Sequence, residues 1–237
     1  MLARGARVTV TTRNPGDLAE LGARVVAFER VGEFVREGVR VLHSIPPEGS
    51  AGVVEMLGEA PARVVYLSTT GVYGGALVVD EATAVDWGSE RARVRLEEEA
   101  RVRAGKWSSL VLRPAAIYGV GRGAQELVRR GAYAAGENFV SRIHVDDLAA
   151  HGEAALVSEV SGAYPVADEE PARTREVGEF CAALMGIPLV VGAESAGLRR
   201  TMGNRRVDGS AIRRLLGVEL RYPSYRVGIP ACLEASG

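Results

Sequence analysis

The chain has 237 residues, of which 47% are hydrophobic and 25% are charged, and its formal net charge at pH 7 is -1. This length suits one α/β domain with a small appendage and is short for two full domains. The balanced charge gives no basic field for nucleic acid, so we expect a small-molecule partner instead. We find no apolar stretch of membrane-spanning length and no signal-peptide pattern, so we expect a cytoplasmic protein without membrane contact. The two cysteines and three histidines are scattered, which predicts no metal site.

Strands and helices alternate along the first two thirds of the chain. The expected strands cover residues 6–12, 24–28, 39–45, 63–68 and 108–113. The expected helices cover residues 17–21, 50–59, 89–104, 124–132 and 146–158. This alternation predicts βαβ units and a parallel sheet with helices on both faces. Farther along, the expected elements are a strand at 163–167, a helix at 174–185 and short pieces to the end.

The most informative segment runs from residue 64 to residue 74 and reads VVYLSTTGVYG. Its apolar part is typical of a buried parallel strand, and ligands of open α/β sheets bind beyond the carboxyl ends of such strands. The hydroxyl side chains of Ser68, Thr69 and Thr70 follow at once and could hydrogen-bond a substrate oxygen or a cofactor ring. They could equally cap and turn the chain, which is the usual role of serine and threonine.

Four stretches together carry a resemblance to a known family. They are LSTTGVYG at 67–74, LRPAAIYG at 112–119, RIHVDDLA at 142–149 and RYPSY at 221–225. With these stretches in this order, the chain resembles the extended short-chain dehydrogenase/reductase superfamily, the group of NAD-dependent epimerases and dehydratases of nucleotide sugars. The last stretch resembles an atypical branch of that superfamily.

The resemblance implies a fold and a function. The fold would be a Rossmann-like doubly wound parallel sheet in residues 1–160, with a small, dependent substrate lobe in residues 161–237. The function would be that of an NAD(P)-dependent epimerase, dehydratase or reductase acting on a sugar or nucleotide-sugar-like substrate. The resemblance also implies a homodimer formed through the helices at 50–60 and 89–104.

The resemblance also assigns candidate site residues by position. Thr69 matches the catalytic Ser/Thr that hydrogen-bonds the substrate, and Tyr73 is our candidate for moving the proton, with Tyr118 as the alternative. The cofactor-binding candidates are Arg13, His43, Ser44, Ile45, Ser68, Arg93, Arg113, Pro114 and Tyr118. The substrate-binding candidates are Thr70, Arg142 and His144.

Several of these positions also have an ordinary structural interpretation. Pro114 could simply end its strand. Asp146 could be the N-cap of the following helix and Asp147 could favour the helix dipole, which is the interpretation we favour for both. Arg142 could bind a substrate phosphate, because a guanidinium suits oxyanions, or could be a solvated surface arginine.

The acid/base pair of the family, Tyr-x-x-x-Lys, has no match here. The only lysine, Lys106, has no tyrosine four positions before it, and no tyrosine lies between Tyr73 and Tyr118. Alignment on the acidic run puts Ser89 and Arg93 at the two positions, and a serine hydroxyl is too weak an acid without an activating base. A non-catalytic NAD(P)-binding sensor or interaction protein is therefore the alternative function.

The helix expected at 89–104 is strongly charged. Its charged residues include Arg91, Arg93, Arg95, Glu97, Glu98 and Glu99. Closely mixed charges of this kind predict a mostly solvated, salt-bridged helix surface.

A dinucleotide-binding fold opens with a strand and a glycine-rich loop that cradles pyrophosphate at a helix N-terminus. Residues 1–5 resemble only the end of that helix, and the glycine-rich segment 119–123 follows a much later strand. We therefore expect the first strand and loop to be missing, most simply through a start codon assigned about thirty residues too late. A truncated, inactive gene product is the third alternative.

Cofactor preference rests on the end of the strand at 6–12. That strand ends in Thr11, Thr12 and Arg13, with no acidic residue to bind a ribose 2′-hydroxyl. Arg13 could accept a 2′-phosphate instead, which slightly favours NADP over NAD.

Overall fold

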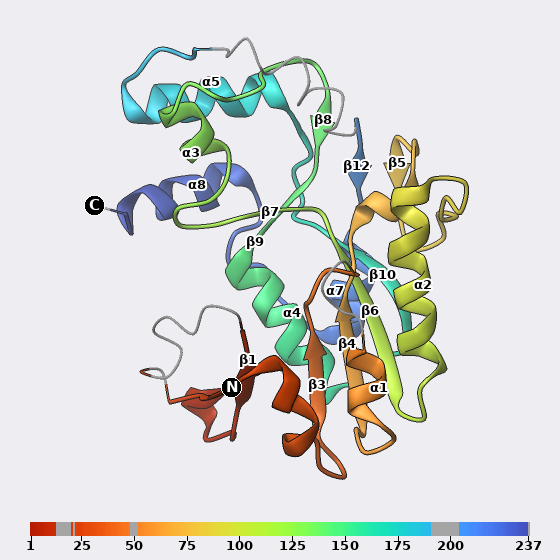
Figure 1. Ribbon diagram of the computed structural model, residues 1–237. Coiled ribbons are helices and arrows are strands. Elements are labelled where there is room, and N and C mark those ends of the chain that lie inside the picture. The colour runs from red at the N-terminus through yellow and green to blue at the C-terminus, as the bar shows by residue number, and fades with distance from the viewer. Residues whose placement is uncertain (13–19, 21, 48–51, 191–203, 237) are drawn as a thin grey trace.

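The computed structural model describes residues 1–12, 20, 22–47, 52–190 and 204–236. Its centre is a four-stranded sheet in the order β10-β6-β4-β3, with every neighbouring pair parallel. The strands are β3 (Arg40–His43), β4 (Arg63–Leu67), β6 (Ser108–Pro114) and β10 (Gly162–Val166). Helices alternate with these strands along the chain (Figure 1). The expected α/β fold with a parallel sheet is confirmed.

Helices cover both faces of this sheet (Figure 1). Successive side chains of a strand point to opposite faces, so Val64 and Tyr66 pack with α1 (Val53–Leu57) and α2 (Glu90–Ala104). Val65 on the other face packs with α4 (Val145–Val157) and α7 (Ser210–Leu216). Burial of each such side chain contributes about 1.5–3 kcal/mol. The two apolar layers hold the sheet in place, so residues at the strand ends can take part in binding.

The N-terminal elements lie at the edge of this core. They are η1 (Leu2–Arg4), β1 (Thr9–Thr11), β2 (Arg24–Val26) and η3 (Phe28–Phe34). Of them only η3 reaches the core within the described residues, through Phe28, which packs against the layer that contains Val64 and Tyr66. Strands β1 and β2 pair with each other in parallel as a separate two-stranded sheet. Within the described residues, β3 has no strand on its outer side, and His43 is the first buried residue of the chain. The helix expected at 17–21 falls almost wholly outside the described residues.

A second apolar cluster, which we call the C-terminal lobe, combines C-terminal segments with residues 118–135, which the sequence assigned to the Rossmann-like unit. Helices α3 (Ala124–Arg129), α5 (Thr174–Met185) and α8 (Tyr225–Glu234) pack around it. Short strand pairs connect the lobe to the sheet domain: parallel β7 (Ala116–Tyr118) with β9 (Arg142–His144), antiparallel β8 (Phe139–Val140) with β11 (Ala172–Arg173), and parallel β5 (Val78–Val79) with β12 (Arg206–Val207). These pairings bring residues 139–141 and 205–207 to the carboxyl ends of β4 and β6 (Figure 1).

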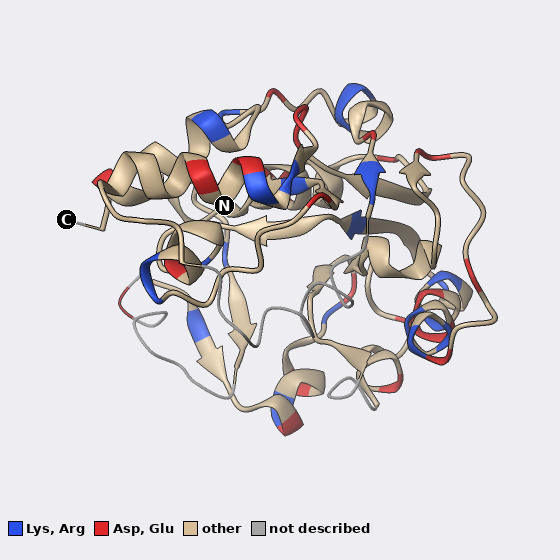
Figure 2. Cartoon of the chain, turned by 90° about the horizontal axis from the view of Figure 1, so that it is seen from above, with Lys and Arg blue, Asp and Glu red and all other residues tan. Residues whose placement is uncertain are grey.

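Two local expectations need correction. The N-cap of α4 is His144 and not the expected Asp146, because a ring nitrogen of His144 accepts a hydrogen bond of 3.2 Å from the Asp146 N–H. Helix α2 carries basic and acidic residues together (Figure 2), and most of its residues are exposed as expected, but two of its glutamates are not. Glu98 and Glu99 are 2% and 0% exposed, because each finds a basic partner on the sheet.

The cap expected at Ser50 lies outside the described residues, and the N-cap of α1 is Gly52, whose φ of 80° favours glycine. None of the described helices is both long and apolar enough to span a membrane.

Candidate functional site

The site is built where β4 and β6 end. Ser68 continues the β4 ladder, because its N–H donates to the Leu112 carbonyl at 2.8 Å. Thr69 then leaves the sheet and caps η5 (Thr70–Tyr73), with its hydroxyl accepting a bond of 3.1 Å from the Gly71 N–H. Thr69 and Thr70 are both half-buried. The hydroxyl run therefore both caps a turn and reaches the carboxyl edge of the sheet.

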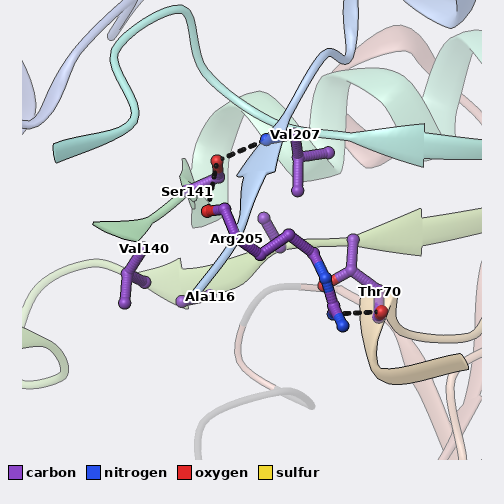
Figure 3. A pocket seen from close by; sticks show the side chains of 7 residues that line it. Thr70, Ala116, Val140, Ser141, Arg205 and Val207 are labelled. Atoms are coloured by element: carbon purple, nitrogen blue, oxygen red, sulfur yellow. Dashed lines mark hydrogen bonds between the residues drawn. The ribbon is translucent and has the colours of Figure 1, made fainter. Parts of the chain in front are cut away.

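A pocket of about 160 Å³ opens beside this turn (Figure 3). Its walls come from four parts of the chain that are far apart in sequence: Thr70, Ala115, Ala116, Val140, Ser141, Arg205 and Val207. Four of these side chains are small or branched apolar groups, and the polar ones are two hydroxyls and one guanidinium. The pocket is the place where a substrate oxygen could meet the Thr69–Thr70 turn.

A buried network of hydrogen bonds lies beneath the turn. The Ser68 hydroxyl donates to Oε1 of Glu99 at 2.6 Å. The Arg113 guanidinium binds both oxygens of Glu99, at 3.1 and 2.7 Å, and donates a third bond of 3.1 Å to the Tyr73 hydroxyl. Glu99, which was not a candidate, thus joins Ser68 to Arg113, and Arg113 extends the network to Tyr73.

Tyr73 keeps its proton in this network. Its side chain is 2% exposed, and burial raises its pKa while the hydrogen bond and charge of Arg113 oppose that rise. Its hydroxyl accepts from Arg113, so its own O–H remains a donor.

Other candidates lie inside the C-terminal lobe. Tyr118 is 3% exposed, its hydroxyl donates to the Ser224 carbonyl at 3.3 Å, and burial raises its pKa. Arg142 is also buried and donates to the Val140 carbonyl at 2.8 Å. His144 is buried with Nε2 at 3.3 Å from the sulfur of Cys232, and burial lowers its pKa. The structure does not bring these three side chains to the pocket lining.

The candidates at the end of β3 divide into two kinds. His43 is buried against Glu98, with Nε2 at 3.2 Å from its carboxylate, and burial lowers the pKa of the imidazole. Its other ring nitrogen accepts from the Ile45 N–H at 3.3 Å, and Ile45 packs against the apolar layer next to α2. Ser44 is exposed, so of the three it alone presents a free polar face at the strand end.

The remaining candidates are Arg93, Pro114 and Arg13. Arg93 is exposed on α2 with its guanidinium 3.9 Å from Glu97. Pro114 is buried and ends β6 in register with Val166. Arg13 lies outside the described residues.

Sequence reasoning missed the far walls of the pocket, above all Arg205 and Ser141. The Ser141 hydroxyl accepts a hydrogen bond of 2.8 Å from the Val207 N–H. This bond links β12 to the point where β8 ends and β9 begins. No pattern in the sequence pairs these segments, since two-residue strands have no usable periodicity. The two adjacent arginines at 205 and 206 were the one sequence feature that could have indicated a charged group in this wall of the pocket.

Comparison with solved structures decides the fold. A functionally unknown conserved protein from Silicibacter pomeroyi superposes with a TM-score of 0.79 and 28% identity over 99% of this chain and 92% of its own. MoeE5, in complex with UDP-glucose and NAD, superposes with a TM-score of 0.78 and 20% identity over 98% of this chain and 91% of its own. Human epimerase family protein SDR39U1, with NADPH, superposes with a TM-score of 0.76 and 17% identity over 98% of this chain and 92% of its own.

The chain has the fold of the extended short-chain dehydrogenase/reductase proteins. The Rossmann-like fold expected from the four sequence stretches is therefore confirmed. No known protein-family profile and no curated protein sequence matches the chain. At these identities the likeness establishes the fold, and the chemistry has to be argued from the site.

Proposed function

We propose that this protein binds NAD(P) and acts as an epimerase/dehydratase-type oxidoreductase on a sugar or nucleotide-sugar-like substrate. The observation that carries the proposal is the position of Thr69 and Thr70 at the carboxyl end of β4, beside a pocket of about 160 Å³. In open α/β sheets this edge is where ligands bind. MoeE5 holds UDP-glucose and NAD in the same fold, which supports the choice of substrate class.

The carboxyl ends of the strands fit a dinucleotide at several points, on the central sheet and on the separate β1–β2 pair. The Thr11 hydroxyl at the end of β1 is buried without a hydrogen-bond partner among the described residues, which suits a ribose contact. Ser44 at the end of β3 is exposed, and Thr70 faces the pocket. Thr11 and Ser44 would hold the cofactor, Thr70 would face the substrate, and Arg13 would favour the 2′-phosphate of NADP. A bound nicotinamide supplies hydride transfer.

The chain's own residues divide the remaining work. Thr69 orients the substrate hydroxyl or carbonyl through its hydroxyl group. Tyr73 is protonated at neutral pH, and burial raises its pKa further, so it would act first as a hydrogen-bond donor and only second as a proton source. The small side chains of Ala115 and Ala116 leave room for the substrate next to the turn.

The first experiment measures binding and turnover separately. Calorimetry with NAD and NADP gives the cofactor and its preference, and nicotinamide absorbance with UDP-glucose and UDP-glucuronate gives turnover. We expect micromolar binding, tighter for NADP, and slow turnover. Binding without turnover across a wider nucleotide-sugar panel would favour the sensor function, and absence of binding to either cofactor would reject the proposal.

Dimerisation is a separate part of the proposal. We propose α1 and α2 as the contact surface, and light scattering of the purified protein tests it. Substituting glutamate for the exposed Val94 on α2 should then give monomers, whereas an unchanged mass would reject this surface.

A further inference from the structure

Arg205 holds the turn that follows Thr69. Its Nε donates to the Ala76 carbonyl at 3.1 Å, and its two terminal nitrogens donate to the carbonyls of Thr70 and Gly74. All three acceptors belong to the segment that begins at the candidate catalytic hydroxyl. The guanidinium is therefore fixed in position before any ligand arrives (Figure 3).

The positive charge of Arg205 has no anionic partner in the part of the chain that the structure describes. Its acceptors are neutral carbonyls, and no described carboxylate lies within salt-bridge distance. None of the seven residues that line the pocket is acidic. Arg113 differs in this respect, because Glu99 neutralises it. A half-buried, uncompensated guanidinium in a pocket wall attracts an anion.

Arg205 also retains donor capacity. A guanidinium carries five N–H groups, and the three bonds to carbonyls leave two of them. The pocket, at about 160 Å³, is smaller than the roughly 300–1,000 Å³ typical of sites for whole drug-sized ligands. It suits one substituent of a substrate whose remainder lies outside.

We propose that Arg205 is a specificity-determining residue that selects a substrate bearing an anionic oxygen group, a carboxylate or a phosphate, in this pocket. The inference rests on the proposed function, because it assigns the substrate class of the same site. Since the guanidinium is already held by the loop, binding an anion requires little further ordering of the side chain.

Two pairs of probes separate the two sources of charge. UDP-glucuronate against UDP-glucose differs by a carboxylate, and UDP against uridine differs by the diphosphate. Calorimetry of the wild type should show at least a tenfold preference for the charged member of one pair, as expected for a charge-assisted hydrogen bond. Equal affinities within both pairs would overturn the proposal.

Variants then assign that preference to Arg205. Arg205→Gln should abolish the preference and Arg205→Lys should keep part of it, because lysine retains the charge. Arg206→Gln is the matched control, since Arg206 lies over the Phe139 ring outside the pocket lining and its loss removes the same net charge. A purely structural role would weaken both members of a pair equally and leave their ratio unchanged, which would reject the assignment.

A second variant covers the case in which Arg205→Gln does not fold. Ala116→Asp places a carboxylate in the lining at an exposed position and leaves the three carbonyl bonds intact. It should cancel the anion preference, and a retained preference would contradict the proposal. NADP binding measured on the same samples keeps the outcomes apart, because loss of cofactor binding speaks against the proposed function and an unchanged anion ratio speaks against Arg205.

Discussion

Glu99 and Arg113 form a bidentate, buried ion pair, with Nε to Oε1 at 3.1 Å and Nη2 to Oε2 at 2.7 Å. Two parallel N–H···O bonds of this kind fix both planes as well as the distance. The pair joins α2 to the end of β6, and through the Ser68 hydroxyl it also joins the end of β4. These hydrogen bonds thus hold the turn that begins at Thr69 in a fixed position relative to β6 and α2.

Breaking this pair should be costly. Glu99→Gln leaves the Arg113 charge buried without its partner, so we expect the free energy of unfolding to fall by about 3–5 kcal/mol. Urea unfolding of the wild type and the variant measures this change in the free energy of unfolding. The matched control is Glu97→Gln on the same helix, which is exposed and should change stability by less than about 1 kcal/mol. Equal effects of the two variants would contradict the structural role of Glu99.

Loss of the Thr69 hydroxyl should separate catalysis from binding. Thr69→Val removes the oxygen expected to orient the substrate, so turnover should fall roughly 10²- to 10³-fold. The variant also loses a helix cap, at a cost of about 0.5–2 kcal/mol. Thr69→Ser keeps the hydroxyl and should retain most of the turnover. Unchanged turnover in Thr69→Val, with cofactor binding intact, would remove Thr69 from the mechanism.

Asp168 should make stability depend on pH. Both of its carboxylate oxygens are buried, and burial raises its pKa to about 7, against the opposing charge of Arg142 and the backbone amides of Glu170 and Arg142. The unfolded chain releases this proton near pH 4. The stabilisation is complete below pH 4 and is lost as the pH rises to 7, a change on the order of 4 kcal/mol.

The variant Asp168→Asn removes this titration. The difference in unfolding free energy between variant and wild type should therefore grow in favour of the variant from pH 4 to 7 and stay constant above. The histidines are common to both proteins, so their titration cancels in the difference. A difference that is flat with pH would show that Asp168 is ionised in the folded protein throughout.

The contact of Gly228 with Tyr118 should be sensitive to one methyl group. A Cβ at Gly228 would lie 2.1 Å from the Tyr118 hydroxyl oxygen and 2.8 Å from its ring. Overpacking of this kind costs about 1–3 kcal/mol, so Gly228→Ala should lower the melting temperature despite its better helix propensity. Adding Tyr118→Phe removes the nearest atom and should recover part of the loss. Full additivity of the two substitutions would show that the side chains do not meet.

Much of the sheet domain was predictable because its central strands, β4 and β6, are buried on both faces. The strand expected at 63–68 appears as β4 (Arg63–Leu67), and the helix expected at 174–185 coincides with α5. Long apolar runs and amphipathic helices carry enough residues for the pattern to be recognised. Helix α8 was missed as a helix, since Pro230 inside it conceals the pattern.

The site was predictable only on the side that lies within one segment. Thr69 and Thr70 belong to a continuous motif, whereas Arg205 reaches Thr70 across 135 positions. Glu99 was misjudged for a similar reason, because a charge within a charged run indicates solvent until the strand that faces it is known. Partners of this kind are set by tertiary packing, which a local pattern does not contain.

The N-terminal sheet has a consequence for how the molecule opens. Elements β1 and β2 contribute no buried side chain, while β4 contributes four. Little apolar area therefore opposes their separation from the rest, and their amide protons should exchange with deuterium through small local openings. Amides of β4 and β6 should exchange only when the whole chain unfolds, so the protein behaves as two cooperative units of unequal strength.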